Sequence, residues 1–403
     1  EALYDVLAVL LRAGFTAQTA SGFAEIARRN PDQVRARSQL VFLSNYTSAA
    51  DPMTTVLEAK ALGDALPRAD APARWWPAAD DPERRLRVGL VSDDFRFHVV
   101  RHFLLGFLKH VDRSRIEFFG YSSTQIQDAF TAQYKQVIRN WFDAETTGDA
   151  DLAQRIAADR IDILIDLGGH TQRPRIGVFA RRPAPVQVTW LGYSGTTGVG
   201  EIDYILGDRF VTPEGSAGQF SETPWPLPDA YLSYDPHRLD IPVKPPPSLE
   251  SRRATFGSLN LLAKVSDETV ALWSRVLAAV PRSRMLVKSN ALDDVRHADA
   301  TRARFQDHGI GADRLVLIGN QPDPVMHLST YNRIDVALDP FPYNGTTTTA
   351  EALWMGVPVL TLRGDRFIAR VGESIVTSVG HPEWVAADQA DLVGRLVGNL
   401  QCC

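Results

Sequence analysis

Cysteine is almost absent from this sequence, and its two copies are the last two residues, Cys402 and Cys403. Adjacent cysteines at one end of a chain cannot brace a core with disulfide bonds, and with scattered histidines they cannot complete a zinc site. The sequence therefore predicts a fold without a disulfide framework and without a metal. Scarce cysteine also fits a reducing cytoplasm, so we expect a cytoplasmic protein.

Long apolar runs are also missing, since none reaches the roughly 18 to 20 residues that span a bilayer. The segment from Leu3 to Phe15 is apolar, but it contains Asp5 and Arg12 and has no basic leader. It therefore predicts a buried helix rather than a signal peptide. We expect no membrane partner.

A strong net charge is the third absence, because the formal charge is only −5 over 403 residues. Such a balance gives no general attraction toward nucleic acid or an anionic membrane. We therefore expect no nucleic-acid partner, and any phosphate group must be bound by a local arrangement of residues.

The length and the two proline-rich stretches predict the domain organisation. Residues 1–65 are rich in Ala and Leu at helical spacing, and a Pro-, Ala- and charge-rich linker follows at 66–84. A second proline-rich segment, the expected hinge, covers 241–252. These breaks leave two larger regions, 85–240 and 253–403.

Both larger regions alternate short apolar runs with helical segments, which predicts α/β lobes with parallel sheets. Strands are expected at 86–94, 116–123, 162–169, 186–192 and 203–208, and then at 254–260, 284–290, 314–320, 335–340 and 357–362. Helices of the second lobe are expected at 267–280, 297–308, 323–332 and 347–356. Ligands of such folds bind at the carboxyl ends of strands, so we expect a site facing a cleft between the lobes.

Four consecutive threonines, Thr346 to Thr349, follow Asn344 and Gly345 at the start of an expected helix. One threonine hydroxyl can cap the free N–H groups of the first turn. The further hydroxyls, beside the positive end of the helix dipole, could form a seat for a nucleotide phosphate. From the residues alone, a capped solvated loop and a phosphate site are equally compatible with this run.

Lys264 stands after an expected strand and before a helix that begins near Ser266 and Thr269. This start resembles a capping box but lacks its Glu or Gln. A lysine at the carboxyl end of a strand can neutralise a diphosphate. Taken singly, however, a lysine in a loop is more often simply solvated.

His98 and His102 are four residues apart and would share one face of a helix. That spacing could indicate a metal pair, but no third ligand in the usual arrangement accompanies it. We interpret His98 as a polar group at a strand end that can hydrogen-bond a substrate.

The segment from 166 to 204 is dense in glycine and contains His170 and Thr171 between two expected strands. Its glycine pairs permit close approach of the backbone to a ligand, and equally fit ordinary tight turns.

Four segments together resemble the catalytic region of the O-GlcNAc transferase family and its SPINDLY-like relatives. They are "LRVGLVSDDFRFHVVRHF", "DILIDLGGHTQRPRIGVFARRPAPVQVTWLGYSGTTGVGEIDYILGD", "GSLNLLAKVSDETVALWSRVL" and "IDVALDPFPYNGTTTTAEALWMGVPVLTLRGDRFIARVG", within about residues 85 to 390. The resemblance implies two Rossmann-like lobes of the glycosyltransferase B type after a helical, TPR-like region. It also implies an inverting, metal-independent transferase that moves a sugar from a nucleotide diphosphate to Ser or Thr hydroxyls of proteins.

The resemblance also implies roles for individual residues. His98 matches a histidine at the sugar and acceptor side, and Lys264 matches a lysine that contacts the diphosphate. His327 matches a histidine near the nucleobase or ribose, and Glu351 an acidic residue at the ribose hydroxyls. The remaining expected nucleotide-sugar contacts are His170, Thr171, Leu261, Asn344, Gly345, Thr346, Thr347 and Thr348.

Three departures from the family pattern bear on the donor. Thr346 stands where animal members have His, Glu351 where they have Asp, and Leu261 where an amide side chain is common. The expected donor is UDP-GlcNAc, with GDP-fucose second and UDP-glucose third.

Two other interpretations stay open at this level. A nucleotide-sugar-binding scaffold without turnover would keep the same fold, as would a nucleotide-sugar 2-epimerase or a synthase of small glycosides. The acceptor proton has two possible destinations, His98 or the α-phosphate of the donor itself.

Overall fold

A computed structural model describes residues 2–69, 81, 83–236 and 239–400 of the chain. Most of the expected linker at 66–84 lies outside these described residues, and so do both cysteines.

The chain forms two compact units, and each unit contains part of the helical region. The first, here called the N-lobe, consists of Phe23–Ser44 and Ala50–Asp235. The second, here called the C-lobe, consists of Glu1–Gly22, Asn45–Ala49 and Pro236–Cys403. The helical region is therefore divided between the two lobes.

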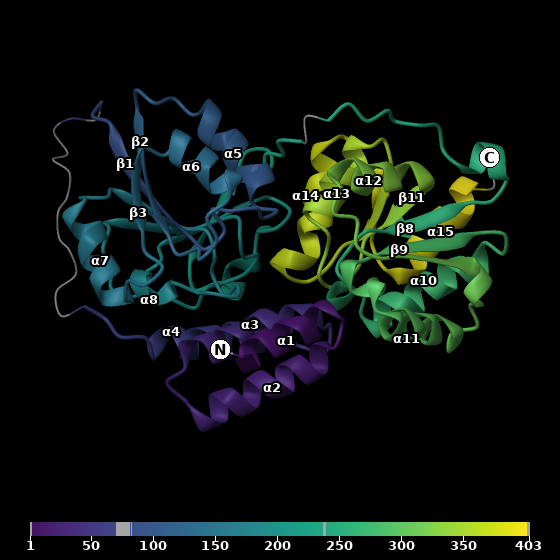
Figure 1. The fold of residues 1–403 in the computed structure, drawn as a ribbon, viewed down its shortest axis with the longest axis horizontal. Helices are drawn as coiled ribbons and strands as arrows, with labels where there is room; N and C mark the ends of the chain where they lie inside the picture. The colour runs from purple at the N-terminus through teal and green to yellow at the C-terminus, as the bar shows by residue number, and fades with distance from the viewer. Residues whose placement is uncertain (1, 70–80, 82, 237–238, 401–403) are drawn as a thin grey trace. The chain divides into compact units, whose positions relative to one another are not determined.

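Within its described residues, the N-lobe contains a seven-stranded parallel sheet in the order β3-β2-β1-β4-β5-β6-β7. Figure 1 labels its strands β1, β2 and β3. Its strands are Leu86–Ser92 (β1), Ile116–Ser122 (β2), Asn140–Asp143 (β3), Ile163–Asp166 (β4), Val186–Thr189 (β5), Tyr204–Asp208 (β6) and Thr223–Leu227 (β7). The strand order reverses between the neighbours β1 and β4. Such a switch point is where open α/β sheets bind ligands.

Helices cover both faces of this sheet. They are Arg101–His110 (α5), Ala129–Val137 (α6), Asp149–Ala158 (α7) and Ile176–Phe179 (α8). Tyr121 of β2 packs in one buried cluster with residues of α7 and α8. Phe118, three residues earlier and thus on the other face, contacts Phe107 of α5.

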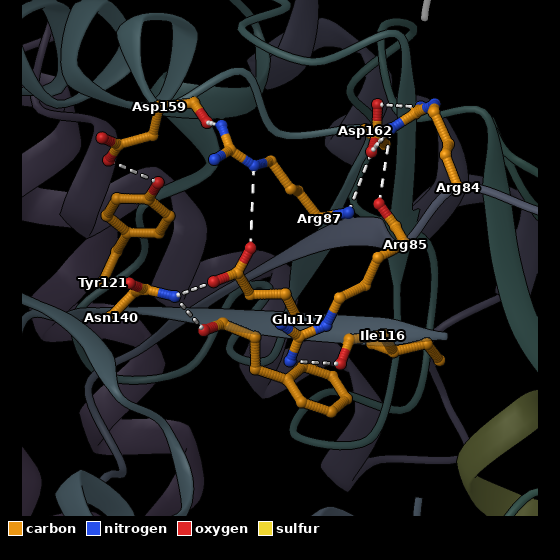
Figure 2. Close-up of polar contacts among 10 residues, drawn as sticks. Arg84, Arg85, Arg87, Ile116, Glu117, Tyr121, Asn140, Asp159 and Asp162 are labelled. Carbon is orange, nitrogen blue, oxygen red and sulfur yellow. Dashed lines mark hydrogen bonds and ion pairs between the residues drawn. The ribbon is translucent and has the colours of Figure 1, made fainter. Parts of the chain in front are cut away.

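A network of charged groups joins the amino ends of β1, β2 and β4 (Figure 2). The buried Asp162 carboxylate accepts hydrogen bonds from Arg84 at 2.6 and 2.9 Å and from the backbone N–H of Arg87 at 2.8 Å. Arg87 donates to the Asp159 carbonyl at 2.9 Å and lies 3.7 Å from the Glu117 carboxylate. These contacts fix the end of the sheet opposite to the one where a ligand is expected.

The C-lobe repeats the same principle with a six-stranded sheet over its described residues, in the order β10-β9-β8-β11-β12-β13. All its strand pairs are parallel. The strands are Thr255–Ser258 (β8), Arg284–Lys288 (β9), Leu315–Ile318 (β10), Val336–Leu338 (β11), Val359–Leu362 (β12) and Val385–Ala386 (β13). Its order reverses between β8 and β11.

The C-lobe sheet is buried on both faces. Its helices are Ser248–Ser251 (α9), Asp267–Ala279 (α10), Val295–Gln306 (α11), Pro324–Ser329 (α12), Thr347–Trp354 (α13), Val371–Ser378 (α14) and Gln389–Leu400 (α15). Met285 of β9 packs with Trp273 of α10 and Phe305 of α11. The next residue, Leu286, packs on the other face with Tyr331, which follows α12.

The helical prediction for residues 1–65 is confirmed, but the expected burial of the first helix is wrong, because Leu7 is the only buried one of its described residues and Leu3, Val6 and Val9 are exposed. The region contains Ala2–Arg12 (α1), Thr16–Arg29 (α2), Val34–Leu43 (α3) and Pro52–Asp64 (α4). Its relation to TPR repeats stays a prediction. Searching the described residues finds no helix with the length and apolar character to cross a membrane.

All ten expected strands are present, and the two-lobed α/β prediction is confirmed. Strands β3, β7 and β13 were not expected from the sequence. β3 and β7 are the edge strands of the N-lobe sheet and are not buried on both faces, unlike the almost wholly apolar inner strands. The edge strand β13 of the C-lobe sheet is buried, but it contains only two residues, too few to give a sequence pattern.

Candidate active site

Two loops of the C-lobe lie at the carboxyl edge of its sheet, because the strands that precede them, β8 and β11, are neighbours. One loop begins at Leu259 and continues through Lys264. The other begins at Asp339 and ends at Thr346, before α13. This is the switch point of the C-lobe, where folds of this type bind nucleotides.

Lys264 ends a short 3-10 turn, Leu262–Lys264, just before α10. Ser266 caps that helix by accepting a hydrogen bond from the Thr269 N–H at 3.1 Å, as the sequence predicted. The Lys264 ammonium donates to the Asn344 carbonyl at 2.8 Å and lies 4.4 Å from the centre of the Tyr343 ring. One cation therefore joins the two loops.

Asp339, a buried residue directly after β11, acts electrostatically on Lys264. Burial lowers the pKa of the Lys264 ammonium, and the charge of Asp339 partly offsets this effect. Burial raises the pKa of Asp339, whereas its hydrogen bonds and the ammonium act in the opposite direction. A bound diphosphate would bring further negative charge to Lys264 and so favour its charged form.

Asp339 and Asn344 hold the second loop in shape. The Asp339 carboxylate accepts from the Gly345 N–H at 2.6 Å and from the Thr361 hydroxyl at 2.8 Å. The Asn344 side-chain oxygen accepts from the Gly372 N–H at 3.1 Å, and Asn344 itself is fully buried. The Asn344 amide also donates to the Pro340 carbonyl of the loop at 2.9 Å, so both polar side chains bond the loop backbone from inside the lobe.

Gly345 is required by space. A Cβ atom there would lie 2.6 Å from the Thr348 hydroxyl, 2.7 Å from the Thr349 hydroxyl and 3.1 Å from a carboxylate oxygen of Asp339. The loop therefore turns into α13 only because this position has no side chain.

The threonines after Gly345 have different surroundings. Thr346 is the N-cap residue of α13, but its side chain makes no hydrogen bond to the first turn, so the predicted threonine cap is wrong. Its backbone angles, φ −118° and ψ −74°, differ from the extended conformation in which a hydroxyl reaches the first-turn N–H groups. Thr348 donates to the Asn260 side chain at 2.9 Å, while Thr347 and Thr349 are buried.

Glu351 lies one turn further along α13 and is buried. Its carboxylate contacts His327 Nε2 at 3.0 Å and accepts from the Tyr331 hydroxyl at 3.2 Å. Burial lowers the pKa of Lys288, and the charge of the Glu351 carboxylate partly offsets that shift. The two residues expected near the nucleoside, His327 and Glu351, are thus in direct contact. Leu261, the third departure from the family pattern, is 46% exposed in the loop after β8.

In the N-lobe, His98 lies after β1 and before α5, so it does not share a helix face with His102. The spacing argument for a helical pair is therefore wrong, because α5 begins only at Arg101. His98 Nδ1 lies 3.3 Å from the Asp94 carboxylate. Burial lowers the pKa of His98 to about 4 and raises that of Asp94 to about 6.

His170 is fully buried in the loop between β4 and α8. Its Nδ1 lies 2.6 Å from the Ser38 hydroxyl of α3, its ring meets Tyr193 edge-on, and burial lowers its pKa to about 4. The Thr171 hydroxyl donates to the Gly168 carbonyl at 2.7 Å. Both residues contact the scaffold of the N-lobe, and a direct role toward a nucleotide sugar stays a prediction.

Comparison with known proteins identifies the family. The model of glycosyl transferase family 41 matches residues 69–242 and 247–397. This chain belongs to glycosyl transferase family 41. Across the described residues, no group of three or more His, Cys, Asp or Glu side chains is arranged to hold a metal ion.

Family 41 relatives match most of the chain. It is 36% identical over 326 residues to the probable UDP-N-acetylglucosamine–peptide N-acetylglucosaminyltransferase SPINDLY of Arabidopsis thaliana, covering 79% of this chain and 35% of that protein. The UDP-N-acetylglucosamine–peptide N-acetylglucosaminyltransferase of Caenorhabditis elegans is 24% identical, and the match covers 78% of this chain and 37% of that protein. The solved structure of a mutant of Thermobaculum terrenum O-GlcNAc transferase matches with 34% identity and a TM-score of 0.92, covering 98% of this chain and 75% of that one. The chain spans about a third of the length of the curated relatives.

Within this family 41 chain, the C-lobe contains nine of the expected site residues. They are Leu261, Lys264, His327, Asn344, Gly345, Thr346, Thr347, Thr348 and Glu351. The N-lobe contains His98, His170 and Thr171. Their roles toward a ligand stay predictions.

Sequence reasoning missed several residues that hold this candidate site together. Asp339 could have been found, since it directly follows an apolar strand at the carboxyl edge. Tyr331 also left a signal, four residues after His327. Nothing in the sequence pointed to the contacts of Asn260, Tyr343 or Lys288.

Proposed function

We propose that this chain forms the catalytic region of an inverting glycosyltransferase that moves GlcNAc from UDP-GlcNAc to Ser or Thr hydroxyls of proteins. The observation that carries the proposal is the contact of Lys264 with the loop that leads into α13, at the switch point of the C-lobe. The names of the SPINDLY relatives, which specify UDP-N-acetylglucosamine and a peptide, support the donor and the acceptor class.

The chemistry follows from where charge develops. Cleavage of the bond between sugar and phosphate builds negative charge on the departing diphosphate. The Lys264 ammonium and the positive end of α13 can stabilise that charge, because they are fixed in place before the reaction starts. The proposed mechanism therefore needs no metal ion for this step. Glu351, to which His327 and Tyr331 are hydrogen-bonded, would face the nucleoside.

On the acceptor side, His98 is a neutral imidazole at neutral pH, because its pKa is lowered to about 4. A neutral imidazole can accept a proton from an attacking hydroxyl. The α-phosphate of the donor is the alternative acceptor, in which case His98 positions the substrates. A cytoplasmic location, expected from the scarcity of cysteine, stays a prediction.

A thermal-shift panel with UDP, UDP-GlcNAc, GDP and GDP-fucose tests the donor. A ligand that binds only the folded state increases the free energy of unfolding, by about 2.7 kcal/mol when the free ligand concentration is a hundred times Kd, and so raises the melting temperature. We expect stabilisation by UDP and UDP-GlcNAc. Stabilisation by GDP and not by UDP would refute the proposed donor in favour of GDP-fucose.

The reaction class is tested by following the label of a radioactive donor. We expect label on protein acceptors. Label only on small molecules would indicate a small-glycoside synthase, an altered free nucleotide sugar would indicate an epimerase, and binding without any turnover would indicate a scaffold.

A further inference from the structure

The short segment Asn45–Ala49, between α3 and α4, belongs to the C-lobe although both flanking helices belong to the N-lobe. Tyr46, at the end of the 3-10 turn Ser44–Tyr46, is only 6% exposed. The Ser48 hydroxyl donates to the Glu268 carboxylate in the first turn of α10, the helix that follows Lys264. A piece of the helical region is thus built into the lobe that contains Lys264.

Tyr46 contacts the expected phosphate-binding loop through Tyr343. The centres of the two rings are 4.4 Å apart and their planes are tilted by 34°, and the two side chains also share a hydrogen bond. Burial raises the pKa of Tyr343 to about 12 and raises that of Tyr46 as well. Both phenols are therefore neutral, so neither competes with a phosphate for a cation.

Tyr343 in turn contacts the ammonium of Lys264, which lies 4.4 Å from its ring centre. A cation at this distance is attracted by the negative face of an aromatic ring. The same ammonium donates to the Asn344 carbonyl at 2.8 Å, next in sequence to Tyr343. Because an ammonium carries three N–H donors, the ring and the carbonyl can define where it lies and still leave a donor for an anion.

We propose that Tyr46 and Tyr343 are positioning residues that hold the Lys264 ammonium in place for the diphosphate of the nucleotide. This inference rests on the proposed function and deepens it. It assigns to the helical region, through Tyr46, a part in donor binding in addition to any part in acceptor presentation.

The three residues act in sequence: Tyr46 fixes the plane of the Tyr343 ring, and that ring favours the charged form of Lys264 at one position. Removing the Tyr343 ring should weaken diphosphate binding and lower the pH at which the ammonium loses its proton. Phenylalanine keeps the ring and removes only the hydroxyl. A merely structural role for Tyr343 would change stability without changing this pH dependence.

The experiment is a calorimetric titration of the full chain with nucleoside diphosphate from about pH 6 to pH 9. This range brackets the lowered pKa of Lys264 and the raised pKa of Asp339, the buried carboxyl group that acts on the same ammonium and is unchanged in every variant. The variants are Tyr343→Leu, Tyr343→Phe, Tyr46→Leu and Tyr46→Phe. The probe is whichever of UDP and GDP stabilises the unmodified protein, so a wrong donor assignment changes the probe and not the reasoning. The corresponding nucleoside without phosphates, at high concentration, reports on base and ribose contacts alone.

We expect Tyr343→Leu to weaken diphosphate binding by about tenfold at neutral pH, in line with a lost cation–π contact. Its loss of affinity with rising pH should begin at lower pH than in the unmodified protein, and nucleoside binding should be unchanged. Tyr343→Phe should retain both affinity and pH profile to within about threefold. Tyr46→Leu should show a smaller shift in the same direction, which Tyr46→Phe largely restores.

Phe15→Leu is the matched control. Phe15 also connects the N-terminal helices to the C-lobe, through an edge contact with His297 at 5.7 Å rather than through Tyr343. We expect it to lower the melting temperature without changing diphosphate affinity or its pH profile.

Two results would overturn the inference separately. If Tyr343→Leu binds diphosphate with unchanged affinity and pH profile, the positioning role is wrong while the proposed function stands. If the unmodified protein binds neither UDP nor GDP, the proposed function is wrong and this inference falls with it. If Tyr46→Leu, like Phe15→Leu, lowers only the melting temperature, the positioning role is limited to Tyr343 and the proposed part of the helical region in donor binding is refuted.

Discussion

Replacing Lys264 by methionine tests the central electrostatic argument. Methionine has a similar length and no charge, so the change removes the ammonium with little loss of packing. Two unit charges about 4 Å apart interact by about 4 kcal/mol at an effective dielectric constant of about 20, which reproduces measured effects even at buried sites. Loss of a single preorganised donor to an oxyanion costs about 3 kcal/mol. We therefore expect kcat to fall by about 10²- to 10³-fold.

The assay is transfer of labelled sugar to a protein acceptor under saturating donor, with KM measured in parallel. KM should rise less than kcat falls, because the charge on the departing diphosphate is larger in the transition state than in the intact donor. The folded state should lose only about 1 kcal/mol, since Asp339 can take up a proton when its cationic neighbour is removed.

Lys244→Met is the control for removal of a lysine from the same lobe, because Lys244 is exposed and distant in sequence from the site loops. It should leave kcat within about twofold. A missing oxyanion donor is expected to lower kcat by about 10²-fold. If Lys264→Met instead retains more than about half of the unmodified kcat, the proposal that Lys264 stabilises the leaving group is refuted.

Three further predictions address the loop, the histidine and the scaffold. Gly345→Ala should weaken UDP binding more than about tenfold in calorimetry, because its Cβ would meet two threonine hydroxyls at 2.6 and 2.7 Å and displace the loop at a cost of about 1 to 3 kcal/mol. Since the pKa of His98 is lowered to about 4, we expect its base form, and the activity that depends on it, to persist as the pH falls until near that value. An activity loss centred near the usual imidazole pKa of about 6.5 that disappears in His98→Gln would contradict this expectation. An activity loss near pH 6 that disappears in Asp94→Asn would instead report the titration of the Asp94 carboxyl group. Asp162→Asn should reduce the free energy of unfolding by about 1 to 2 kcal/mol in urea titrations, discounted because its partner Arg84 is partly exposed, and should leave kcat/KM unchanged. A matching loss of kcat/KM would show that the amino edge of the sheet communicates with the site.

The inner strands were predictable because both of their faces are buried. Segments such as "LRVGLVS" and "RMLVK" are mostly apolar, and their parallel pairing follows from the alternation with helices. The edge strand β7, "TPWPL", contains two prolines, which only an edge strand tolerates, so its composition resembles a loop.

The site was predictable where position along a strand determines it. Lys264 and Asn344 follow two strands that turn out to be neighbours, and the two residues are in contact. Thr347 and Thr348 lie in the first turn of α13, and their role toward a phosphate stays a prediction. The threonine cap was wrong because Thr346 does not adopt the extended backbone conformation of a capping residue, and no local pattern reveals that conformation. Contacts between residues as far apart in the chain as Tyr46 and Tyr343 depend on the tertiary fold and leave no trace in sequence spacing.

The division of the helical region between the lobes limits how this chain could be recombined with its relatives. The chain passes between the two compact units at four points, after residues 22, 44, 49 and 235. A chimera that exchanges only residues 253–403 would place a new sheet in one unit with the original α1 and Asn45–Ala49 segment. This compact unit could therefore be exchanged whole between family 41 members only by grafting three separate stretches of sequence together, even though the second sheet is continuous along the chain.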